Sequence, residues 1–278
     1  MSGKTNIEWA EKVWNPTIGC TRVSPGCAHC YAFDVHDKRH KGYKDALARG
    51  EKPKLPPQYA KPFKDFQFFG GRLQDPMHWR KPARIFVNSM SDVFHERMTI
   101  EFWSAMVTTM TLCPQHQFLI LTKRADRMMD FCQQAPPPPN AWMGVTVENQ
   151  KAADERIPYL LKTPAAVRWL SVEPMLERIK VDFGDKADAG VLIKWVVCGG
   201  ESGPKSRSFN IEWARDLRDQ CQAAGSAFFM KQLGAKPMED VGAPEFGFNG
   251  FAGLQLEDRK GGKMDEWPED LRIREYPQ

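Results

Sequence analysis

Residues 117–132 read QFLILTKRADRMMDFC, an apolar run followed by a polar turn and then a helix-like segment. A short apolar run bounded by polar residues is typical of a strand that is buried on both faces. Apolar residues spaced three and four apart indicate an amphipathic helix. The stretch therefore predicts one strand followed by one helix.

The same order of strand, polar turn and helix recurs along the chain. The predicted strands are ARIFVNS (83–89), QFLILTK (117–123), AWMGVTV (141–147), AVRWLSV (166–172), LIKWVVC (192–198) and SAFFMKQ (226–232). The predicted helices lie in residues 99–113, 123–132, 149–161 and 210–225. In the last helix we expect Asn210 to be the N-cap and Gly225 to be the C-terminal stop. Apolar strands that alternate with helices favour a parallel α/β fold.

An open doubly wound sheet and a barrel share this pattern. We favour a complete or partial (β/α) TIM-type barrel as a single domain over residues 1–278, because every strand ends in polar or charged residues. These endings are SMSD, TKR, TVEN, SVEP, CGGES and MKQ. In such barrels the active site gathers at the C-terminal ends of the strands. For any single ending, the alternative is a solvated loop.

The composition is that of an ordinary globular protein, with 278 residues, 42% hydrophobic content and 27% charged content. The first residues lack the apolar run of a signal peptide, and no long apolar stretch suggests a membrane span. We therefore expect a cytoplasmic protein with no membrane partner. Seven cysteines in a reducing compartment argue against a disulfide framework.

Three cysteines crowd into GCTRVSPGCAHCYA (19–32): Cys20, Cys27 and Cys30. The other four stand at apolar positions and are predicted to be small buried hydrophobic residues: Cys113, Cys132, Cys198 and Cys221. Three thiolates with His29 or His36 as a fourth ligand would suit zinc. Three thiolates alone would suit a [4Fe–4S] cluster with one iron left open. The residues leave both interpretations standing.

A basic, aromatic-rich segment at residues 34–82 interrupts the strand–helix rhythm and is predicted to be an insertion. Its residues 38–81 hold twelve Lys or Arg against four Asp or Glu, a net charge of +8 (12 − 4), whereas the whole chain carries +4. Basic groups attract phosphates and aromatic rings stack on unpaired bases, so the segment suggests nucleic acid. Alternatively, the lysines are merely solvated and the aromatic residues pack the insertion onto the barrel.

Several motifs together resemble a family of phage and bacterial proteins that is similar to radical S-adenosylmethionine (SAM) enzymes. They are NPTIGCTRVSPGCAHCYA (15–32), FVNSMSDVFHE (86–96), TKRADRM (122–128), GVTVENQ (144–150), SVEPM (171–175) and CGGESG (198–203). The resemblance implies a [4Fe–4S] cluster on Cys20, Cys27 and Cys30, SAM at the open iron, an external one-electron reductant and a 5′-deoxyadenosyl radical. The spacing C-x₆-C-x₂-C departs from the family pattern, which has three residues in the first gap.

The resemblance also implies SAM contacts at the strand ends. Ser89, Ser91 and Asp92 lie at or just after the end of the run 83–89, which is the second strand if the first precedes the cysteine loop. They are candidates for the methionine end of SAM. Glu148 and Asn149 follow the run 141–147, the fourth strand in the same numbering, where radical SAM enzymes often bind the ribose. Their oxygens would accept the ribose hydroxyl protons.

Further candidates lie at other strand ends. Lys123 and Arg124 would pair with the SAM carboxylate or with a substrate phosphate. Glu173 is either a SAM or substrate ligand or a cap for the following turn. Radical SAM enzymes often hold the methionine amine with a GGE-like segment after the second strand. Here Gly199, Gly200 and Glu201 follow the run 192–198, the sixth strand in the same numbering, which departs from that pattern.

These expectations predict a radical SAM-type iron–sulfur enzyme that acts on a nucleic acid or nucleotide, by DNA lesion repair or base modification. One alternative is a zinc-containing nucleic-acid-binding protein without radical chemistry. Another is an iron–sulfur barrel enzyme that transfers electrons without SAM. Iron, sulfide and zinc content distinguish the first alternative from the prediction, and SAM cleavage distinguishes the second.

Overall fold

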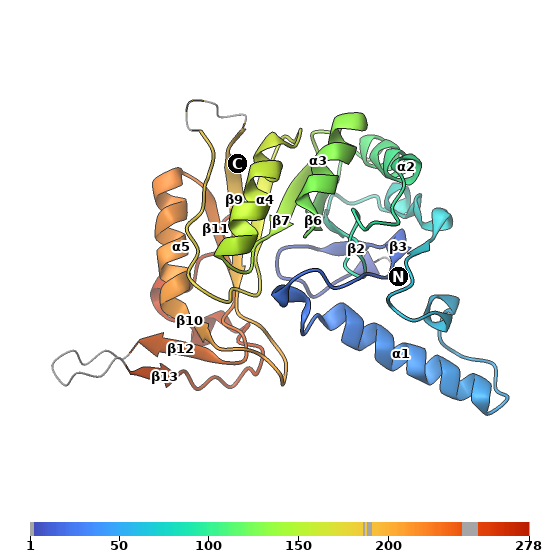
Figure 1. Cartoon of the computed structure of the whole chain (residues 1–278), viewed down its shortest axis with the longest axis horizontal. Coiled ribbons are helices and arrows are strands. Elements are labelled where there is room, and N and C mark those ends of the chain that lie inside the picture. The colour runs from blue at the N-terminus through green and yellow to red at the C-terminus, as the bar shows by residue number, and fades with distance from the viewer. Residues whose placement is uncertain (1–2, 186, 188–190, 241–249, 278) are drawn as a thin grey trace. The chain divides into compact units, whose positions relative to one another are not determined.

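The computed structural model describes residues 3–185, 187, 191–240 and 250–277 (Figure 1). The chain divides into two compact units, Met1–Trp142 and Met143–Gln278. Both units combine helices with mostly parallel strands, so the predicted α/β class is confirmed. A closed barrel is not shown, and the single barrel domain with an insertion stays a prediction. No helix among the described residues is long and apolar enough to cross a bilayer.

The first unit is built on a sheet with the strand order β1-β2-β5-β6. Strands β2, β5 and β6 are parallel, and β1 is antiparallel to β2. A separate antiparallel pair joins β3 to β4. The elements are β1 (Gly3–Lys4), β2 (Lys12–Trp14), β3 (Thr17–Ile18), α1 (Tyr31–Ala48), β4 (Gln67–Phe68), β5 (Arg84–Val87), α2 (Ile100–Thr111), β6 (Gln117–Thr122) and α3 (Ala125–Gln134).

The core of this unit lies around the parallel strands. Trp14 on β2 and Phe118 on β6 are fully buried, and their ring centroids are 5.7 Å apart. Met106 and Met110 on α2 are buried as well. Because these apolar side chains fix the strands, the polar residues that follow β5 and β6 are brought to the same edge of the sheet.

The second unit has the parallel strand order β7-β8-β9-β11. A smaller sheet has the order β10-β12-β13. The elements are β7 (Ala141–Thr146), which begins at the boundary between the units, α4 (Gln150–Lys162), β8 (Arg168–Val172), β9 (Ile193–Gly199), β10 (Phe209–Asn210), α5 (Ile211–Ala224), β11 (Ala227–Gln232), β12 (Pro237–Asp240) and β13 (Phe251–Gly253).

The core of the second unit is rich in tryptophan. Trp169 on β8 and Trp195 on β9 are fully buried, with ring centroids 5.2 Å apart. Helix α5 packs against β9, β11 and β12. The chain end runs beside β11, where the Met230 amide donates to the Ile273 carbonyl over 2.8 Å.

The strands and helices predicted from apolar periodicity are confirmed, with ends that differ by at most two residues. Asn210 caps α5 by accepting a hydrogen bond from the Glu212 amide, and Gly225 ends it in the left-handed region. The expectation missed α1 and the short strands β1 to β4. Those strands have two or three residues, too few for a period to be visible. Helix α1 buries only Ala32, Phe33, His36 and Ala46, so it lacks a continuous apolar stripe.

Candidate functional site

The three crowded cysteines lie on one irregular loop of the first unit, between β3 and the start of α1. Cys20, Cys27 and Cys30 are each half-buried, and none forms a disulfide. The other four cysteines are buried, as expected. The loop includes one short 3₁₀ turn, Pro25–Cys27, in which the Cys27 amide donates to the Ser24 carbonyl. The loop carries the sulfurs outside the strands and helices that form the core.

Cys20 is held from two sides through its own backbone and that of Gly19. The Gly19 amide donates to the Met90 carbonyl over 3.0 Å, and the Cys20 amide donates to the Phe63 carbonyl over 2.9 Å. Gly19 has a φ of +106°, and a Cβ there would stand 2.6 Å from the carbonyl oxygen of Asp65. The position therefore requires glycine. It brings the cysteine loop into contact with the basic segment.

A buried ion pair lies behind this loop. The Arg124 guanidinium donates to the Asp92 carboxylate over 2.9 Å, and both side chains are at least nine-tenths buried. Asp92 also accepts from the hydroxyl of Thr122 at 2.7 Å and from the backbone amides of Phe94 and Lys123. These donors fix the carboxylate in place.

Arg124 links this pair to the cysteine loop. One of its nitrogens donates to the Thr21 hydroxyl at 2.8 Å, and another lies 3.9 Å from the Cys20 sulfur. The His95 ring completes the support, because its Nε2 lies 3.2 Å from the same hydroxyl and its face stacks on Phe66. Burial lowers the pKa of His95, and the neighbouring Arg124 charge lowers it further. Arg124 therefore serves as an anchor for the residues around Cys20.

The electrostatics at Cys20 combine opposing effects. Burial raises the pKa of its thiol to about 11, and the Asp92 charge adds to the rise, while Arg124 opposes it. Cys30 is the N-cap residue of α1, where the helix dipole favours negative charge. The loop thus carries thiols beside a fixed cation and a helix N-terminus, which are the features that stabilise thiolates once a metal binds them.

The donor set fits an iron–sulfur cluster in its chemistry, because it consists of three thiols on one short segment. Among the described residues, no three His, Cys, Asp or Glu side chains are gathered closely enough to hold a metal ion. His36 lies in the core, fully buried, with its ring beside Tyr59 and Phe63 and its Nε2 2.9 Å from the Lys61 carbonyl. The half-buried His29 stays the candidate for the zinc alternative.

The serines after β5 help to shape the same edge of the first unit. Asn88 has a φ of +61°, which turns the chain as it leaves β5, and its side chain donates to the Thr17 hydroxyl at 2.7 Å. The Ser91 hydroxyl lies 2.8 Å from the Thr17 hydroxyl. Ser89 is bonded to Asn15, and its carbonyl accepts from the Tyr31 hydroxyl at 2.7 Å. The structure thus brings Ser89, Ser91, Asp92 and Arg124 together around the cysteine loop.

The remaining predicted site residues lie in the second unit, where a pair follows β7. Glu148 is fully buried and forms an ion pair with Arg156 at 2.8 Å. Asn149 is the N-cap of α4, and its side chain accepts from the Ala152 amide at 2.8 Å. Both side chains therefore have structural partners, and their predicted contact with a ribose stays a prediction.

Glu173 follows β8 and contacts a lysine from β11. Its carboxylate lies 2.8 Å from the Lys231 ammonium and accepts from the Ser171 hydroxyl at 3.3 Å. Glu201 pairs with Arg207 at 2.7 Å and also accepts from the Arg207 amide. Ion pairs thus engage both carboxylates that were predicted as SAM or substrate ligands.

Gly199 and Gly200 lie at the end of β9, between Glu173 and Glu201 in the sequence. A Cβ at Gly199 would stand 3.0 Å from a Glu173 carboxylate oxygen, and one at Gly200 would collide with the Leu233 carbonyl. These two glycines therefore allow other parts of the protein to approach the backbone closely.

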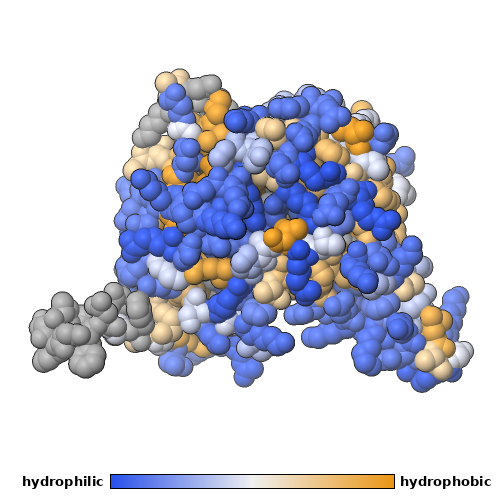
Figure 2. Space-filling model, in the orientation of Figure 1, coloured by the Kyte–Doolittle hydropathy of each residue, from blue (hydrophilic) through white to orange (hydrophobic). Residues whose placement is uncertain are grey.

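The basic segment packs through part of its aromatic content. Tyr59, Phe63 and Phe66 are buried, so they are not available to stack on bases. Lys38, Lys41 and Lys44 on α1 are exposed, as are Lys52, Lys54, Lys61 and Lys64 further along the chain. Figure 2 shows α1, at the lower right of the view, covered mostly by hydrophilic side chains. The segment therefore presents exposed positive charge, whereas part of its aromatic content is not available to stack on bases.

The family described as "Protein of unknown function (DUF5131)" matches residues 4–265 of the chain. The chain belongs to the DUF5131 family. The match includes the cysteine loop, the Asp92–Arg124 pair and the strand ends of both units. No curated protein matches the sequence.

Among solved structures, the DUF5131 chain is similar to "Spore photoproduct lyase complexed with dinucleoside spore photoproduct". The TM-score is 0.44 and the sequence identity is 10%, with 81% of this chain and 64% of that chain covered. The DUF5131 chain thus spans less than two thirds of that protein. A likeness at this level does not establish a shared activity.

The residues that anchor the DUF5131 cysteine loop were only partly visible in the sequence. Thr21 and His95 were not among the predicted site residues, yet both contact the loop's supporting network. Thr21 stands next to Cys20, which was a possible signal, but its partner Arg124 is 103 residues away. No local pattern reports such a pairing.

Proposed function

We propose that this DUF5131 protein is an iron–sulfur enzyme of the radical SAM type, with a [4Fe–4S] cluster on Cys20, Cys27 and Cys30. The observation that carries the proposal is the loop itself, with three half-buried thiols on one irregular segment beside the buried Arg124. Three thiolates leave one iron open for SAM. The proposal includes the partial (β/α) barrel predicted from the strand order.

The loop is suited to receive a cluster without disturbing the core. Its residues lie between β3 and α1, and its only regular element is the short turn Pro25–Cys27. The three sulfurs can therefore converge by a local change. Gly19 and Cys20 keep one end of the loop tied to the Met90 and Phe63 carbonyls, while the N-cap position of Cys30 ties the other end to α1.

The cluster and SAM, when bound, would supply a 5′-deoxyadenosyl radical that abstracts a hydrogen atom from the substrate. The protein's own residues would orient and shield these groups. Arg124 would place positive charge beside Cys20 and so offset the negative charge of the thiolates. Asp92 would hold Arg124 in position through their buried ion pair. Ser89 and Ser91 remain the candidates for the methionine end of SAM.

The proposed substrate class is a nucleic acid or nucleotide, either as a DNA lesion that is repaired or as a base that is modified. The support is the local excess of positive charge in residues 38–81, a net +8 (12 − 4) in a chain of +4. Lys61 and Lys64 are exposed on the stretch whose Phe63 carbonyl bonds to Cys20. A polyanion bound there would lie beside the cysteine loop.

The test is anaerobic reconstitution of the full chain with iron and sulfide, followed by analysis of iron, sulfide and zinc. We expect a brown protein with about four irons per chain. Incubation with SAM and dithionite should then yield 5′-deoxyadenosine. A colourless protein with one zinc per chain would overturn the proposal, and so would a clustered protein that leaves SAM intact.

A further inference from the structure

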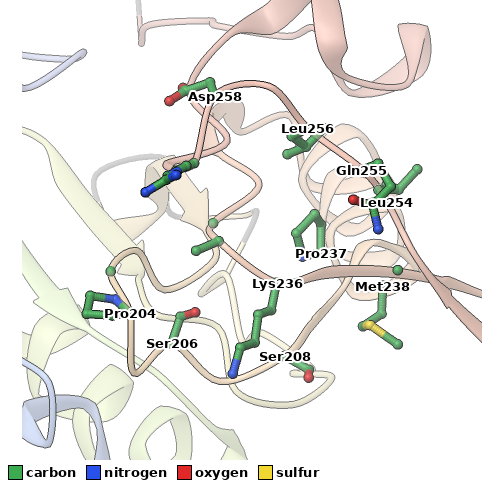
Figure 3. A pocket seen from close by; sticks show the side chains of 15 residues that line it. Pro204, Ser206, Ser208, Lys236, Pro237, Met238, Leu254, Gln255, Leu256 and Asp258 are labelled. Carbon is green, nitrogen blue, oxygen red and sulfur yellow. The ribbon is translucent and has the colours of Figure 1, made fainter.

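A cavity in the second unit lies apart in sequence from every residue of the cysteine loop. Its volume is about 710 Å³, within the range of small-molecule sites. It lies between the stretch that follows Glu201, the start of β12 and the stretch from Gly253 to Arg259 (Figure 3). None of the predicted site residues lines it, although Gly203, the glycine that ends the motif CGGESG, does.

A buried hydroxyl group faces this cavity without a partner. Ser206 lines the cavity and is only 3% exposed, and its Oγ has no hydrogen-bond partner among the described residues. A buried hydroxyl that makes no hydrogen bond is destabilising, so native structures usually satisfy such groups. Its position on the cavity wall indicates that a ligand supplies the missing partner.

Two cations line the same cavity as this hydroxyl. Lys236 and Arg259 line the cavity and are exposed. Figure 3 shows the Lys236 side chain extending toward the segment that carries Ser206 and Ser208. The backbone supports this neighbourhood, because the Phe209 amide donates to the Lys236 carbonyl over 2.9 Å. Two cations and two hydroxyls thus line the same cavity.

The acidic residue of the cavity is engaged within its own loop. The Asp258 carboxylate accepts hydrogen bonds from the backbone amides of Lys260, Gly262 and Lys263. These bonds lower the pKa of Asp258. Its charge is therefore partly offset by fixed amide dipoles, and the balance of the lining is positive.

Apart from Gln255, the rest of the lining consists of apolar side chains and glycines. Pro237, Met238 and Leu256 lie on another side of the cavity in Figure 3. An apolar wall with a few convergent polar groups is the usual character of a site for a small organic molecule. Free inorganic phosphate would use the cations but not this wall.

We propose that this cavity binds a small phosphate monoester, such as a nucleotide or a sugar phosphate, with its phosphate between Ser206, Lys236 and Arg259. At pH 7.5 such a phosphate carries nearly two negative charges and offers three acceptor oxygens. The Ser206 hydroxyl would donate to one oxygen, and the two cations would neutralise the charge. The organic part would lie against the apolar wall.

The test is isothermal titration of the purified full chain with four probes: adenosine 5′-monophosphate, ribose 5-phosphate, adenosine and inorganic phosphate. We expect both monoesters to bind at one site per chain, and adenosine to bind at least about tenfold more weakly, as expected for loss of charged hydrogen bonds. If only adenosine 5′-monophosphate binds among the monoesters, the site is specific for nucleotides; if both bind, it accepts sugar phosphates.

Variants locate the site. Lys236→Ala and Arg259→Ala should each weaken binding of adenosine 5′-monophosphate by roughly tenfold or more. Ser206→Ala should weaken it similarly without lowering the melting temperature, because the hydroxyl makes no hydrogen bond in the fold. Lys205→Ala is the matched control, since Lys205 is exposed on the same stretch but does not line the cavity.

The inference is overturned if neither monoester binds, if adenosine binds as tightly as its phosphate, or if the three cavity variants bind like the wild type. An equal loss in Lys205→Ala would also overturn it, because general surface charge would then explain the binding. Cys27→Ala should retain full binding. Loss of binding in that variant would place the ligand at the cysteine loop and contradict the assignment to this cavity.

Discussion

The carboxylates that were predicted as site residues have different surroundings in the two units. In the second unit each predicted carboxylate is neutralised by a neighbouring cation, as in the Glu148–Arg156, Glu173–Lys231 and Glu201–Arg207 pairs. In the first unit the Asp92–Arg124 pair does more, because the same guanidinium extends to Thr21 and toward the Cys20 sulfur. An ion pair alone is a structural feature, whereas one that reaches a half-buried thiol supports the proposed site.

We expect the largest effect, on iron content, when a cysteine of the loop is replaced rather than a buried cysteine. Cys27→Ala should abolish cluster assembly, with less than one iron per chain after anaerobic reconstitution, because two thiols cannot hold the cluster. The melting temperature should change little, since the loop lies outside the core. Cys132→Ala is the control, because Cys132 is fully buried in α3 and its replacement should lower stability but leave the iron content unchanged.

A second comparison uses the two buried arginines. Arg124→Ala would leave the buried Asp92 without its cation and should cost about 3–5 kcal/mol of unfolding free energy. It should also lower the iron retained after reconstitution, because it removes the anchor of Thr21. Arg156→Ala should destabilise the protein through loss of its pair with Glu148 but spare the iron. Urea unfolding and iron analysis of both variants provide the measurement.

Equal iron loss in the two arginine variants would contradict a special role for Arg124 and would point to general destabilisation instead. Arg124→Lys sharpens the result. It retains a positive charge beside Asp92 but cannot reproduce the bonds that the guanidinium makes to both Asp92 and Thr21.

The next prediction concerns the basic segment. Replacing Lys38, Lys44 and Lys64 with Gln should weaken binding of a single-stranded oligonucleotide by about tenfold and reduce the slope of log K against log salt by roughly two. All three lysines are exposed. A matched triple in the second unit, Lys151, Lys162 and Lys180 to Gln, removes the same charge and should leave binding nearly unchanged. Equal losses would show that net charge alone governs binding.

The smallest expected effect tests the role of Asn149. Because its side chain accepts from the Ala152 amide at the start of α4, Asn149→Ala should cost about 1 kcal/mol of stability. Asn149→Ser should restore most of that stability, since serine is also an N-cap residue. If Asn149→Ser then shows normal stability but weakened SAM binding, the predicted ribose contact gains support. Normal SAM binding in Asn149→Ser would remove that contact.

The sequence predicts the main strands and helices because their apolar periodicity is local. The run 192–198, for example, corresponds to β9 (Ile193–Gly199), and Asn210 was identified as a cap from its position alone. The short strands escape prediction because they depend on pairing with distant segments, and α1 escapes it because it lacks a continuous apolar stripe. Strand β2 has three residues and is defined by its register with β5, more than seventy positions away.

The same distinction between local patterns and contacts with distant segments applies to the candidate site. The cysteine loop is a contiguous motif and was predicted, whereas the support of Cys20 by Phe63, Met90 and Arg124 depends on folding. Arg124 was selected as a cofactor or substrate ligand, and the structure places it against Asp92 and Thr21. Asn149 shows a related limit. A polar residue between a strand and a helix suits both a cap and a ligand, and the residue type alone does not distinguish the two.

The most direct test of the central claim is electron paramagnetic resonance of the anaerobically reconstituted, dithionite-reduced protein, with and without SAM. The account predicts the signal of a reduced [4Fe–4S] cluster on Cys20, Cys27 and Cys30 and a clear change of that signal when SAM binds the open iron. A cluster signal that does not respond to SAM, or a sample that holds zinc and gives no cluster signal, would contradict the account.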